Sequence, residues 1–338
     1  MPVNRHFSDD QLRELLAATT PDSQLTSKAS AVRQQVYGNK VFIRGLIEFT
    51  NYCKNDCYYC GIRKSQTNVS RYRLTPEQIL DCCNTGYSLG FRTFVLQGGE
   101  DGWWNDDRLC RVVELIKFNH PDCAITLSVG EKSRASYQRL FDAGADRYLL
   151  RHETADEGHY RTLHPDNLTL ENRMECLQNL KDIGFQVGCG FMVGSPGQTI
   201  EHLIKDLRFI EEFRPHMVGI GPFLPAAGTP FAGEKAGSAD LTIKLLSIIR
   251  LMHPKVLLPA TTALGTAETD GRERGILAGA NVIMPNLSPQ DVRKKYMLYD
   301  NKIATGDEAA ESVNYLRKSM KNIGYEVVTD RGDYFDYK

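Results

Sequence analysis

Short runs of apolar, β-branched residues alternate along the chain with longer stretches in which apolar residues recur at helical spacing. Eight runs of the first kind predict buried strands: 41–49, 93–97, 124–129, 147–151, 185–193, 216–220, 255–260 and 280–284. Seven stretches between them predict helices: 75–89, 106–119, 133–143, 169–183, 199–213, 240–252 and 270–279. Eight strands separated by seven helices is the count of a (βα)8 barrel. The pattern therefore predicts an α/β fold with a complete TIM-type (βα)8 barrel.

Helical segments flank this repeat on both sides. The first begins after Ser8, a suitable N-cap, and the second runs from about residue 23 to 37 and stops at Gly38. A further helix is expected near 307–323, followed by a charged tail, TDRGDYFDYK, interpreted as a loosely held end. We expect one domain over 1–338, with N-terminal helices (1–40), the barrel (41–286) and a C-terminal helical cap with its tail (287–338).

Composition narrows the class of protein. The chain has 338 residues, a formal net charge of −1 and 41% hydrophobic residues, so charge gives no reason to expect nucleic acid or an anionic membrane as a partner. The polar N-terminus and the lack of long apolar runs predict a cytoplasmic protein without membrane spans. In such a compartment the nine cysteines are not expected to form disulfides. Six scattered ones are interpreted as small buried hydrophobes: Cys82, Cys83, Cys110, Cys123, Cys176 and Cys189.

Polar residues and glycines recur where the expected strands end. In a barrel of this type the chemistry lies at the carboxyl ends of the strands. The second strand ends in Gln97-Gly98-Gly99-Glu100 and the fourth in Arg151-His152-Glu153. The ends of the third and seventh strands carry Thr126 with Ser128 and Thr261 with Thr262. One rim of the barrel is therefore the candidate active site.

Three cysteines after the first strand form a C-x3-C-x2-C motif at Cys53, Cys57 and Cys60. A structural zinc site needs four closed ligands, and the chain offers no fourth nearby. Three thiolates suit a [4Fe–4S] cluster in which one iron lacks a protein ligand and is open to a small molecule. The residues favour this cluster, with zinc and a coincidence of spacing left as alternatives.

The motif in this context, with an aromatic residue before the last cysteine and Gly-Gly-Glu after the second strand, resembles the radical S-adenosylmethionine (SAM) enzymes. Further stretches resemble the HydE family of [FeFe]-hydrogenase maturases within that superfamily: LQGGED, TLSVGE, DRYLLRHETA, MVGSPGQT, MVGIGPFLP, PATTALGT and GANVIMPN. The resemblance extends from about residue 40 to 300. It implies an enzyme that reductively cleaves SAM to methionine and a 5′-deoxyadenosyl radical.

The resemblance also implies residue roles. Cys53, Cys57 and Cys60 would hold the cluster, with SAM on the fourth iron. The residues implied to contact SAM are Tyr59, Gln97, Gly98, Gly99, Glu100, Glu153, Arg173, Met192 and Leu224. Those implied to line the substrate cavity are Arg44, Thr126, Arg151, Thr261, Thr262, Tyr296 and Tyr299. Some relatives carry a small hydroxyl residue where this chain has Gly98, so one cavity contact is in doubt.

The family further implies a small organometallic or amino-acid-derived substrate, an iron–cysteine species with carbonyl and cyanide ligands. The implied partners are the maturases HydG and HydF and a reducing flavodoxin or ferredoxin. Some relatives bind a second cluster through C-terminal cysteines. Residues 301–338 contain none, so a single [4Fe–4S] cluster is expected.

Several alternatives stay open. Arg44 could simply pair with Glu48, which lies on the same face of its strand, and Thr261 and Thr262 could cap their own backbone. His152 is expected to be structural. Methylornithine synthase and biotin synthase share the barrel and the cysteine motif, although the usual second-cluster cysteines of biotin synthase are not found. A non-catalytic iron–sulfur or zinc protein is the alternative from another class.

Overall fold

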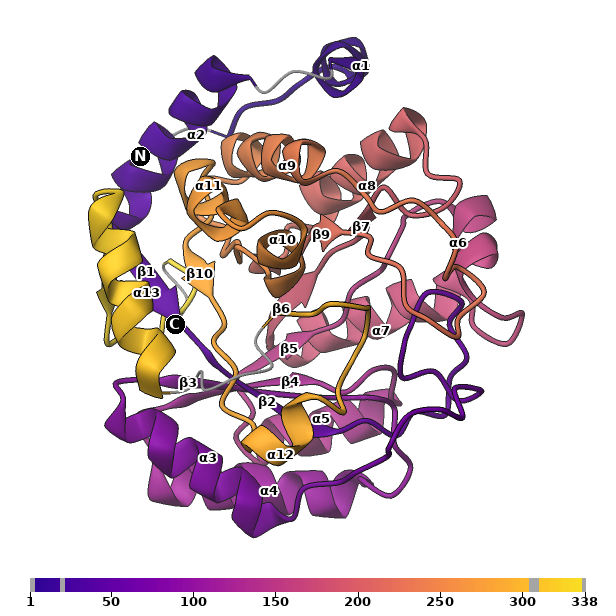
Figure 1. Cartoon of the computed structure of the whole chain (residues 1–338), viewed down its shortest axis with the longest axis vertical. Helices are drawn as coiled ribbons and strands as arrows, with labels where there is room; N and C mark the ends of the chain where they lie inside the picture. The colour runs from indigo at the N-terminus through magenta and orange to yellow at the C-terminus, as the bar shows by residue number, and fades with distance from the viewer. Residues whose placement is uncertain (1–3, 19–21, 304–309, 336–338) are drawn as a thin grey trace.

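The computed structural model describes residues 4–18, 22–303 and 310–335. Figure 1 shows strands gathered at the centre of the molecule and helices around them. Six parallel strands form one sheet in the order β2 (Gly45–Thr50), β3 (Thr93–Gly98), β4 (Ala124–Ser128), β5 (Arg147–Leu149), β6 (Gln186–Cys189) and β8 (Met217–Val218). This order follows the chain, as expected of a barrel wall.

Further pairings lead from β8 back to the first strand. Isolated bridges join Met217 to Leu257 and Pro259 to Val282 of β10 (Val282–Ile283). β10 pairs with β1 (Lys40–Ile43), which continues through Arg44 into β2. The pairings thus return to the segment where they began, which supports the barrel prediction. The expected strand at 255–260 is reduced to two bridges, and Pro259 lacks the N–H that a ladder needs.

The outer helices lie close to their expected positions: α3 (Pro76–Ser88), α4 (Asp106–Asn119), α5 (Arg134–Asp142), α7 (Leu170–Ile183), α8 (Ile200–Phe213), α9 (Ala239–Met252) and α11 (Gly271–Leu277). Capping explains their starts, because the Thr75 and Thr199 side chains each accept from the third helical N–H in a capping box. Short elements at the strand ends were not expected: α6 (Glu157–Leu163), α10 (Thr262–Ala267), α12 (Gln290–Arg293) and β9 (Gly221–Pro222). The strand expected at 185–193 is divided into β6 and β7 (Met192–Val193).

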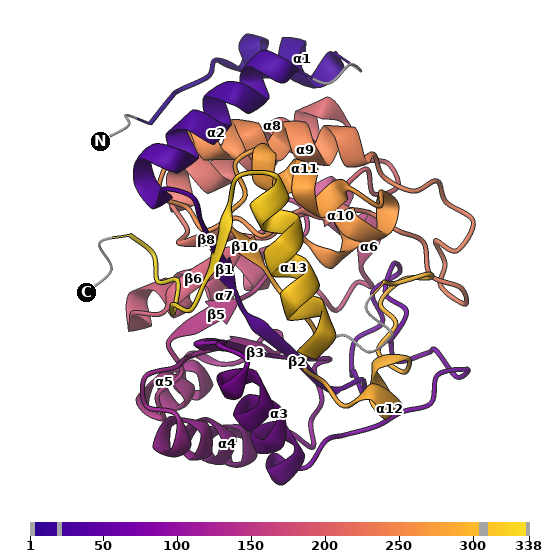
Figure 2. The same ribbon diagram turned by 60° about the vertical axis from the view of Figure 1, so that its left-hand side comes forward.

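The N-terminal helices cover one side of the barrel. α1 (Asp9–Ala17) packs on α8 and α2 (Ser23–Tyr37) packs on α9, as Figure 2 shows. Ser8 caps α1 and Gly38 ends α2, as expected. Because α2 lies over α9, almost every residue of α9 is buried, including the fully buried Arg250. No helix in the described ranges is long and apolar enough to cross a membrane.

Over residues 310–335 the C-terminal segment is held against the barrel, so the expectation of a loose tail was wrong for the described part; residues 336–338 lie outside the described residues. After α13 (Ala310–Asn322), β11 (Glu326–Val328) adds a parallel strand to β1. Arg147, with no exposed surface, then pairs with Asp333 at 2.6 Å and donates to the carbonyl of Arg331 at 2.9 Å. Gln186 also donates to Asp333 at 2.8 Å. A buried guanidinium needs such a partner, and the tail supplies it.

We expect Asp333→Ala to lower the free energy of unfolding by roughly 3 kcal/mol, because the change leaves Arg147 buried without its counter-charge. Urea unfolding of the two proteins measures the difference. Asp10→Ala is the control, since Asp10 forms a solvent-exposed pair with Arg13 and its loss should leave the unfolding midpoint unchanged. Equal midpoints for Asp333→Ala and the wild type would contradict the assigned role of the tail.

Candidate active site

A cavity of about 330 Å³ opens where the carboxyl ends of the strands meet. It brings together most of the side chains and backbone positions expected at the active site. Those at its wall are Cys53, Cys57, Tyr59, Cys60, Gln97, Gly98, Gly99, Glu100, Arg151, Glu153, Arg173, Met192, Leu224, Thr261, Tyr296 and Tyr299. Arg44, Thr126 and Thr262 are not among the lining residues.

The three cysteines of the motif share this cavity, and none is in a disulfide. Burial and the neighbouring Cys53 thiol raise the pKa of Cys60 to about 12. Burial and the Cys60 thiol likewise raise the pKa of Cys57. Three converging thiols therefore resist ionisation unless a cation is bound among them, which is the property of a metal–thiolate site.

The donor set fits an iron–sulfur cluster better than a single ion. No three His, Cys, Asp or Glu side chains of the described part of the chain are placed to hold one metal ion. A zinc site needs four ligands within about 2.3 Å of one point. Three cysteines without a fourth ligand match a cluster with one open iron. The residues present thus fit the expected [4Fe–4S] group.

Two glycines allow the cysteine loop to lie close to its neighbours. A Cβ at Gly61 would lie 2.2 Å from the carbonyl oxygen of Met297, and the Gly61 N–H donates to Leu298 O at 2.9 Å. A Cβ at Gly99 would lie 2.2 Å from the carbonyl oxygen of Tyr52. Only glycine lets these backbones approach so closely. At Gly98 a Cβ would lie 2.7 Å from a methyl carbon of Thr50, so a larger residue there would require Thr50 to move.

Arg173 presents a buried positive charge to the cavity. Its Nε lies 2.5 Å from Glu131 Oε1, and its Nη1 donates to the carbonyl of Arg151 at 2.7 Å. Although burial opposes its charge, Tyr160 and Glu131 hold the pKa of Arg173 well above the usual value. Asn172 donates to the other Glu131 oxygen at 2.6 Å, which fixes the carboxylate. Arg173 is therefore a rigid cation suited to a ligand carboxylate.

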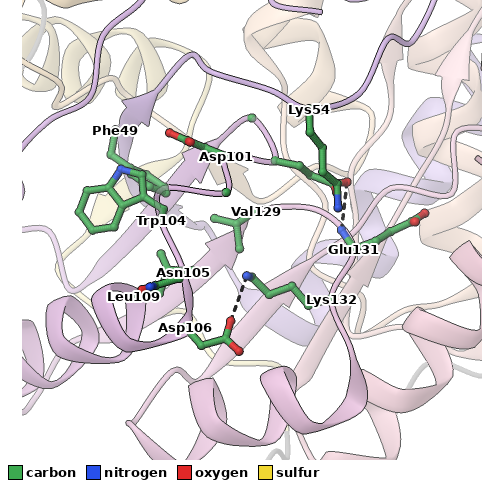
Figure 3. Close-up of a pocket in the computed structure, with 13 residues that line it drawn as sticks. Phe49, Lys54, Asp101, Trp104, Asn105, Asp106, Leu109, Val129, Glu131 and Lys132 are labelled. Atoms are coloured by element: carbon green, nitrogen blue, oxygen red, sulfur yellow. Dashed lines mark hydrogen bonds and ion pairs between the residues drawn. The ribbon is translucent and has the colours of Figure 1, made fainter. Parts of the chain in front are cut away.

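Glu100 lines this cavity and also a neighbouring one of about 260 Å³. Figure 3 shows the neighbouring cavity. Its carboxylate pairs with Lys54 at 3.1 Å and accepts from the Glu131 N–H at 3.1 Å. Lys132 pairs with Asp106 at 3.1 Å on the far wall of the second cavity. The Glu100 carboxylate is thus already paired within the protein, and it helps to fix the backbone of Glu131, the partner of Arg173.

Arg151 and Glu153 leave polar atoms open at the cavity. Their side chains approach to 3.0 Å as an ion pair. However, Arg151 Nε and Nη2 and Glu153 Oε2 are buried and make no directed hydrogen bond within the described residues. Buried polar atoms in native proteins are almost always hydrogen-bonded. Apart from this ion pair, the three atoms have unused hydrogen-bonding capacity in the described ranges, which suits a polar ligand in this part of the cavity.

Glu153 has an unusual backbone that its neighbours impose. Its φ is 65°, in the left-handed region that few residues other than glycine adopt. Asp206 of α8, fully buried, accepts from the Ala155 N–H at 2.6 Å and lies 3.2 Å from His152 Nε2. Gly190 N–H donates to His152 Nδ1 at 3.2 Å, so Nε2 carries the imidazole proton. Asp206 thereby holds both flanks of Glu153, and His152 is structural, as expected.

We expect Asp206→Ala to raise the KM for SAM about tenfold, equivalent to about 1.4 kcal/mol, because Glu153 would relax from its strained backbone. Asp206→Asn keeps the accepting oxygen and should behave like the wild type. Steady-state kinetics with a chemical reductant measure the KM for SAM, and melting curves measure the stability of the same variants. A variant that melts earlier with an unchanged KM would show that Asp206 acts on stability alone.

Tyr59 is positioned by a neutral histidine. Its hydroxyl lies 3.2 Å from His164 Nε2, and His164 Nδ1 lies 3.0 Å from the Tyr160 carbonyl. The carbonyl can only accept, so Nδ1 carries the proton and Nε2 accepts from Tyr59. Burial, followed by the charge of Arg173, lowers the pKa of His164 to about 3. This histidine therefore stays neutral in the folded protein at neutral pH.

His164 makes the fold sensitive to acid. Its unfolded pKa is about 6.5, so below that pH the unfolded chain binds a proton that the folded protein refuses. The contribution to stability is complete above pH 6.5 and is lost as the pH falls towards the folded pKa. Between pH 6 and 5 the free energy of unfolding of His164→Gln should fall less steeply than that of the wild type, by up to about 1.4 kcal/mol per unit. Identical slopes in urea titrations would contradict this.

Three residues implied to contact substrate lie elsewhere. Arg44 is buried; its Nη1 donates to Met217 Sδ at 2.9 Å and its Nη2 to Gly332 O at 3.4 Å. Glu48 instead binds Lys302 and Asn286, so among the described residues the Arg44–Glu48 ion pair that was left as an alternative is not formed. Thr126 is also buried, 2% exposed, and its hydroxyl has no hydrogen-bond partner in the described ranges.

The two threonines after the seventh strand behave differently from each other. The Thr261 hydroxyl accepts from Leu264 N–H at 3.3 Å and caps α10, as the capping alternative predicted, while the residue still reaches the cavity. Thr262 is the first residue of α10. Tyr296 accepts a hydrogen bond from Gln97 at 3.4 Å. This bond links a residue implied to line the substrate cavity with one implied to contact SAM.

Several lining residues were not expected from the sequence, and Glu131 was not expected as the partner of Arg173. Ser128 was expected at the rim but was given no role, and Met284 stands at the end of the eighth expected strand, so position alone could have indicated it. Ala263 lies on α10, and five more come from loops: Asn55, Ile62, Gly130, Phe223 and Leu298. Nothing in their residue types marks them as ligand contacts.

Comparison with known proteins identifies similar chains. The profile of the Radical SAM superfamily matches residues 47–210. The chain is 42% identical over 330 residues to the [FeFe] hydrogenase maturase subunit HydE of Thermotoga maritima, covering 97% of this chain and 94% of that protein. It is 33% identical over 311 residues to 3-methylornithine synthase of Methanosarcina barkeri, covering 91% and 87%.

A solved structure shows the same architecture. The crystal structure of methylornithine synthase (PylB) superposes with a TM-score of 0.85 at 31% identity, over 96% of this chain and 95% of that chain. The barrel inferred from the strand pairings is thus shared by a protein with a similar sequence.

Proposed function

The chain belongs to the HydE family of radical SAM enzymes, and from this we propose that it cleaves SAM during assembly of the two-iron subsite of [FeFe]-hydrogenase. The geometry that carries the proposal is the convergence of three free thiols on a cavity with open polar atoms. Cys53, Cys57 and Cys60 would hold a [4Fe–4S] cluster. When bound, the reduced cluster supplies one electron that splits the sulfonium S–C bond of SAM.

The chain's own residues would bind and orient SAM. Arg173 offers its guanidinium to the methionyl carboxylate, since its pairing with Glu131 leaves one face towards the cavity. Glu153 Oε2 forms an ion pair with Arg151 but makes no directed hydrogen bond in the described ranges, so it can still accept from donors of SAM. Tyr59, Met192 and Leu224 give a largely apolar wall for the adenosyl group.

We further propose a small, anionic substrate, such as an iron–cysteine species with carbonyl and cyanide ligands. Arg151 carries the charge to attract it, and Thr261, Tyr296 and Tyr299 supply hydroxyls around the same cavity. Arg44 and Thr126 do not line the cavity, so any effect of theirs on the substrate would be indirect. A single cluster is proposed, since the other six cysteines are not grouped into a second motif. HydG and HydF remain the proposed partners.

The experiment is a maturation assay. Hydrogenase apoprotein is incubated with HydG, HydF and SAM, with or without this protein after anaerobic iron–sulfur reconstitution. Hydrogen evolution that depends on this protein supports the proposal. Formation of 5′-deoxyadenosine without any gain in hydrogenase activity would refute the maturation role while leaving SAM cleavage intact.

Methylornithine synthesis is the second candidate, favoured by the TM-score of 0.85 to PylB. Incubation of the reconstituted protein with lysine, SAM and reductant distinguishes the two. Appearance of methylornithine would establish this activity. Its absence, together with hydrogenase activation, would exclude it.

A further inference from the structure

We propose that the surface formed by Tyr52, Arg73, Trp103 and Arg108 docks an acidic one-electron carrier protein. The inference rests on the proposed function, since each reductive cleavage of SAM consumes one electron. A donor oxidised by one electron must therefore reach the protein once per turnover. Tyr52, one residue of this surface, directly precedes Cys53 of the cysteine motif.

Charge is concentrated on the cysteine loop. Residues 51–75, between β2 and α3, carry five cations, Lys54, Arg63, Lys64, Arg71 and Arg73, against one anion, Asp56. This local charge of +4 stands out in a chain whose net charge is −1. Such a concentration attracts an acidic partner and accelerates its association.

Two of these cations serve the loop itself. Arg71 donates to backbone carbonyls of Asn51, Ile62 and Arg63, and Arg63 pairs with Asp56 at 2.6 Å. The remaining three, Lys54, Lys64 and Arg73, reach solvent. The surplus positive charge therefore lies on the outside of the loop.

Arg73 joins this charge to an aromatic surface beside Cys53. Its guanidinium lies 3.7 Å from the ring centroid of Tyr52, the residue before Cys53, and 5.6 Å from that of Trp103. Arg108 lies 4.3 Å from the Trp103 ring and donates to the Trp103 carbonyl at 2.7 Å. Trp103 is 41% exposed, which is unusual for so large an apolar side chain. Trp and Arg are the residues enriched in protein interfaces.

The acids nearby lie beneath the surface or are neutralised. Asp101 accepts two hydrogen bonds from Arg73, at 2.6 and 2.9 Å, and only 3% of its side chain is exposed. Glu100 is 11% exposed and pairs with Lys54, whose side chain is 64% exposed. Figure 3 shows Asp101, Trp104 and Lys54 around the cavity under this surface. Each pair is neutral overall, but its cation is the more exposed member, so Arg73 and Lys54 present positive groups to solvent and Arg108 adds a further positive charge.

The acids at the start of α4 also have cationic partners. Asp106 pairs with Lys132 at 3.1 Å and Asp107 with Arg139 at 2.5 Å. They therefore do not cancel the charge of Arg108. A small, cationic, partly aromatic face suits the transient complexes of electron-transfer proteins, which bury little area and depend on electrostatic steering.

The test compares two reductants on the reconstituted holoenzyme. Dithionite is small and needs no docking surface, whereas flavodoxin, kept reduced by its reductase and NADPH, must bind. The readout is the rate of 5′-deoxyadenosine formation at low and high salt. The variants are Arg108→Glu and Trp103→Ala. Lys28→Glu is the matched control, an exposed charge reversal on α2, on the opposite side of the barrel (Figure 1).

At low salt both variants should lose about tenfold or more of the flavodoxin-driven rate, and the dithionite-driven rate should stay unchanged. High salt should lower the flavodoxin-driven rate of the wild type far more than that of Arg108→Glu. Salt screens the attraction between the acidic donor and the positive surface, and the variant has already lost much of that attraction. If Arg108→Glu and Trp103→Ala matched the control Lys28→Glu in flavodoxin-driven rate, the docking surface would be wrong and the proposed function would stand. A wild type that makes no 5′-deoxyadenosine with dithionite would overturn the proposed function, and this inference with it.

Discussion

Replacing Cys57 by serine should abolish both iron–sulfur binding and SAM cleavage. Cys57 is buried beside Cys60, and burial together with that thiol raises its pKa. A serine hydroxyl is a far poorer ligand for iron, and two remaining cysteines cannot hold a cluster that already has one open iron. After anaerobic reconstitution we expect no cluster absorbance, no bound iron above background and no 5′-deoxyadenosine.

Cys110→Ser is the matched control. Cys110 is a free, partly exposed cysteine on α4, and its sulfur lies 3.6 Å from the Arg139 carbonyl, away from the cavity. This variant should bind iron and cleave SAM like the wild type. Retained cleavage in Cys57→Ser would contradict the assignment of the motif, and loss of the cluster in both variants would show that reconstitution responds to any cysteine.

Arg173→Ala should have the next largest effect, on both binding and stability. Glu131 would be left buried without its partner, which is expected to lower the free energy of unfolding by roughly 3–5 kcal/mol. Loss of a charged hydrogen-bond donor to the SAM carboxylate should weaken SAM binding roughly ten- to a hundredfold. Isothermal titration calorimetry measures the affinity for SAM, and urea unfolding measures the free energy of unfolding, on the same preparation.

Two further variants separate these effects. Glu131→Gln/Arg173→Ala removes both charges and should recover stability without recovering SAM affinity. Arg139→Ala removes an exposed arginine paired with Asp107 and should change neither quantity. If the double variant bound SAM as tightly as the wild type, Arg173 would have no part in the site.

The repeat of strands and helices could be predicted because burial imposes periodicity. β2 and β3 are almost wholly buried, and α4 was bounded correctly at both ends. The short elements at the rim were missed because their form depends on tertiary contacts. α10, for example, is six residues long and starts at the Thr261 cap. Local sequence carries little signal for helices of that length.

The candidate site was predictable where residues follow strand ends and not where partners come from elsewhere. Gln97 lies near the end of β3, Arg151 and Glu153 follow β5, and all three line the cavity as expected. Asp206, which holds the backbone of Glu153, lies on α8, 53 residues along the chain, and no spacing indicates it. The tail was misjudged for the same reason, because its anchor, Arg147, lies far away in sequence on β5.

The central claim is that the cysteine loop leaves one iron of a cluster free to bind SAM. Electron paramagnetic resonance of the reduced, reconstituted protein, recorded with and without SAM, tests this most directly. The account predicts a [4Fe–4S] signal whose g-values shift when SAM is added. A signal that SAM leaves unchanged, or a preparation that holds zinc in place of iron, would contradict it.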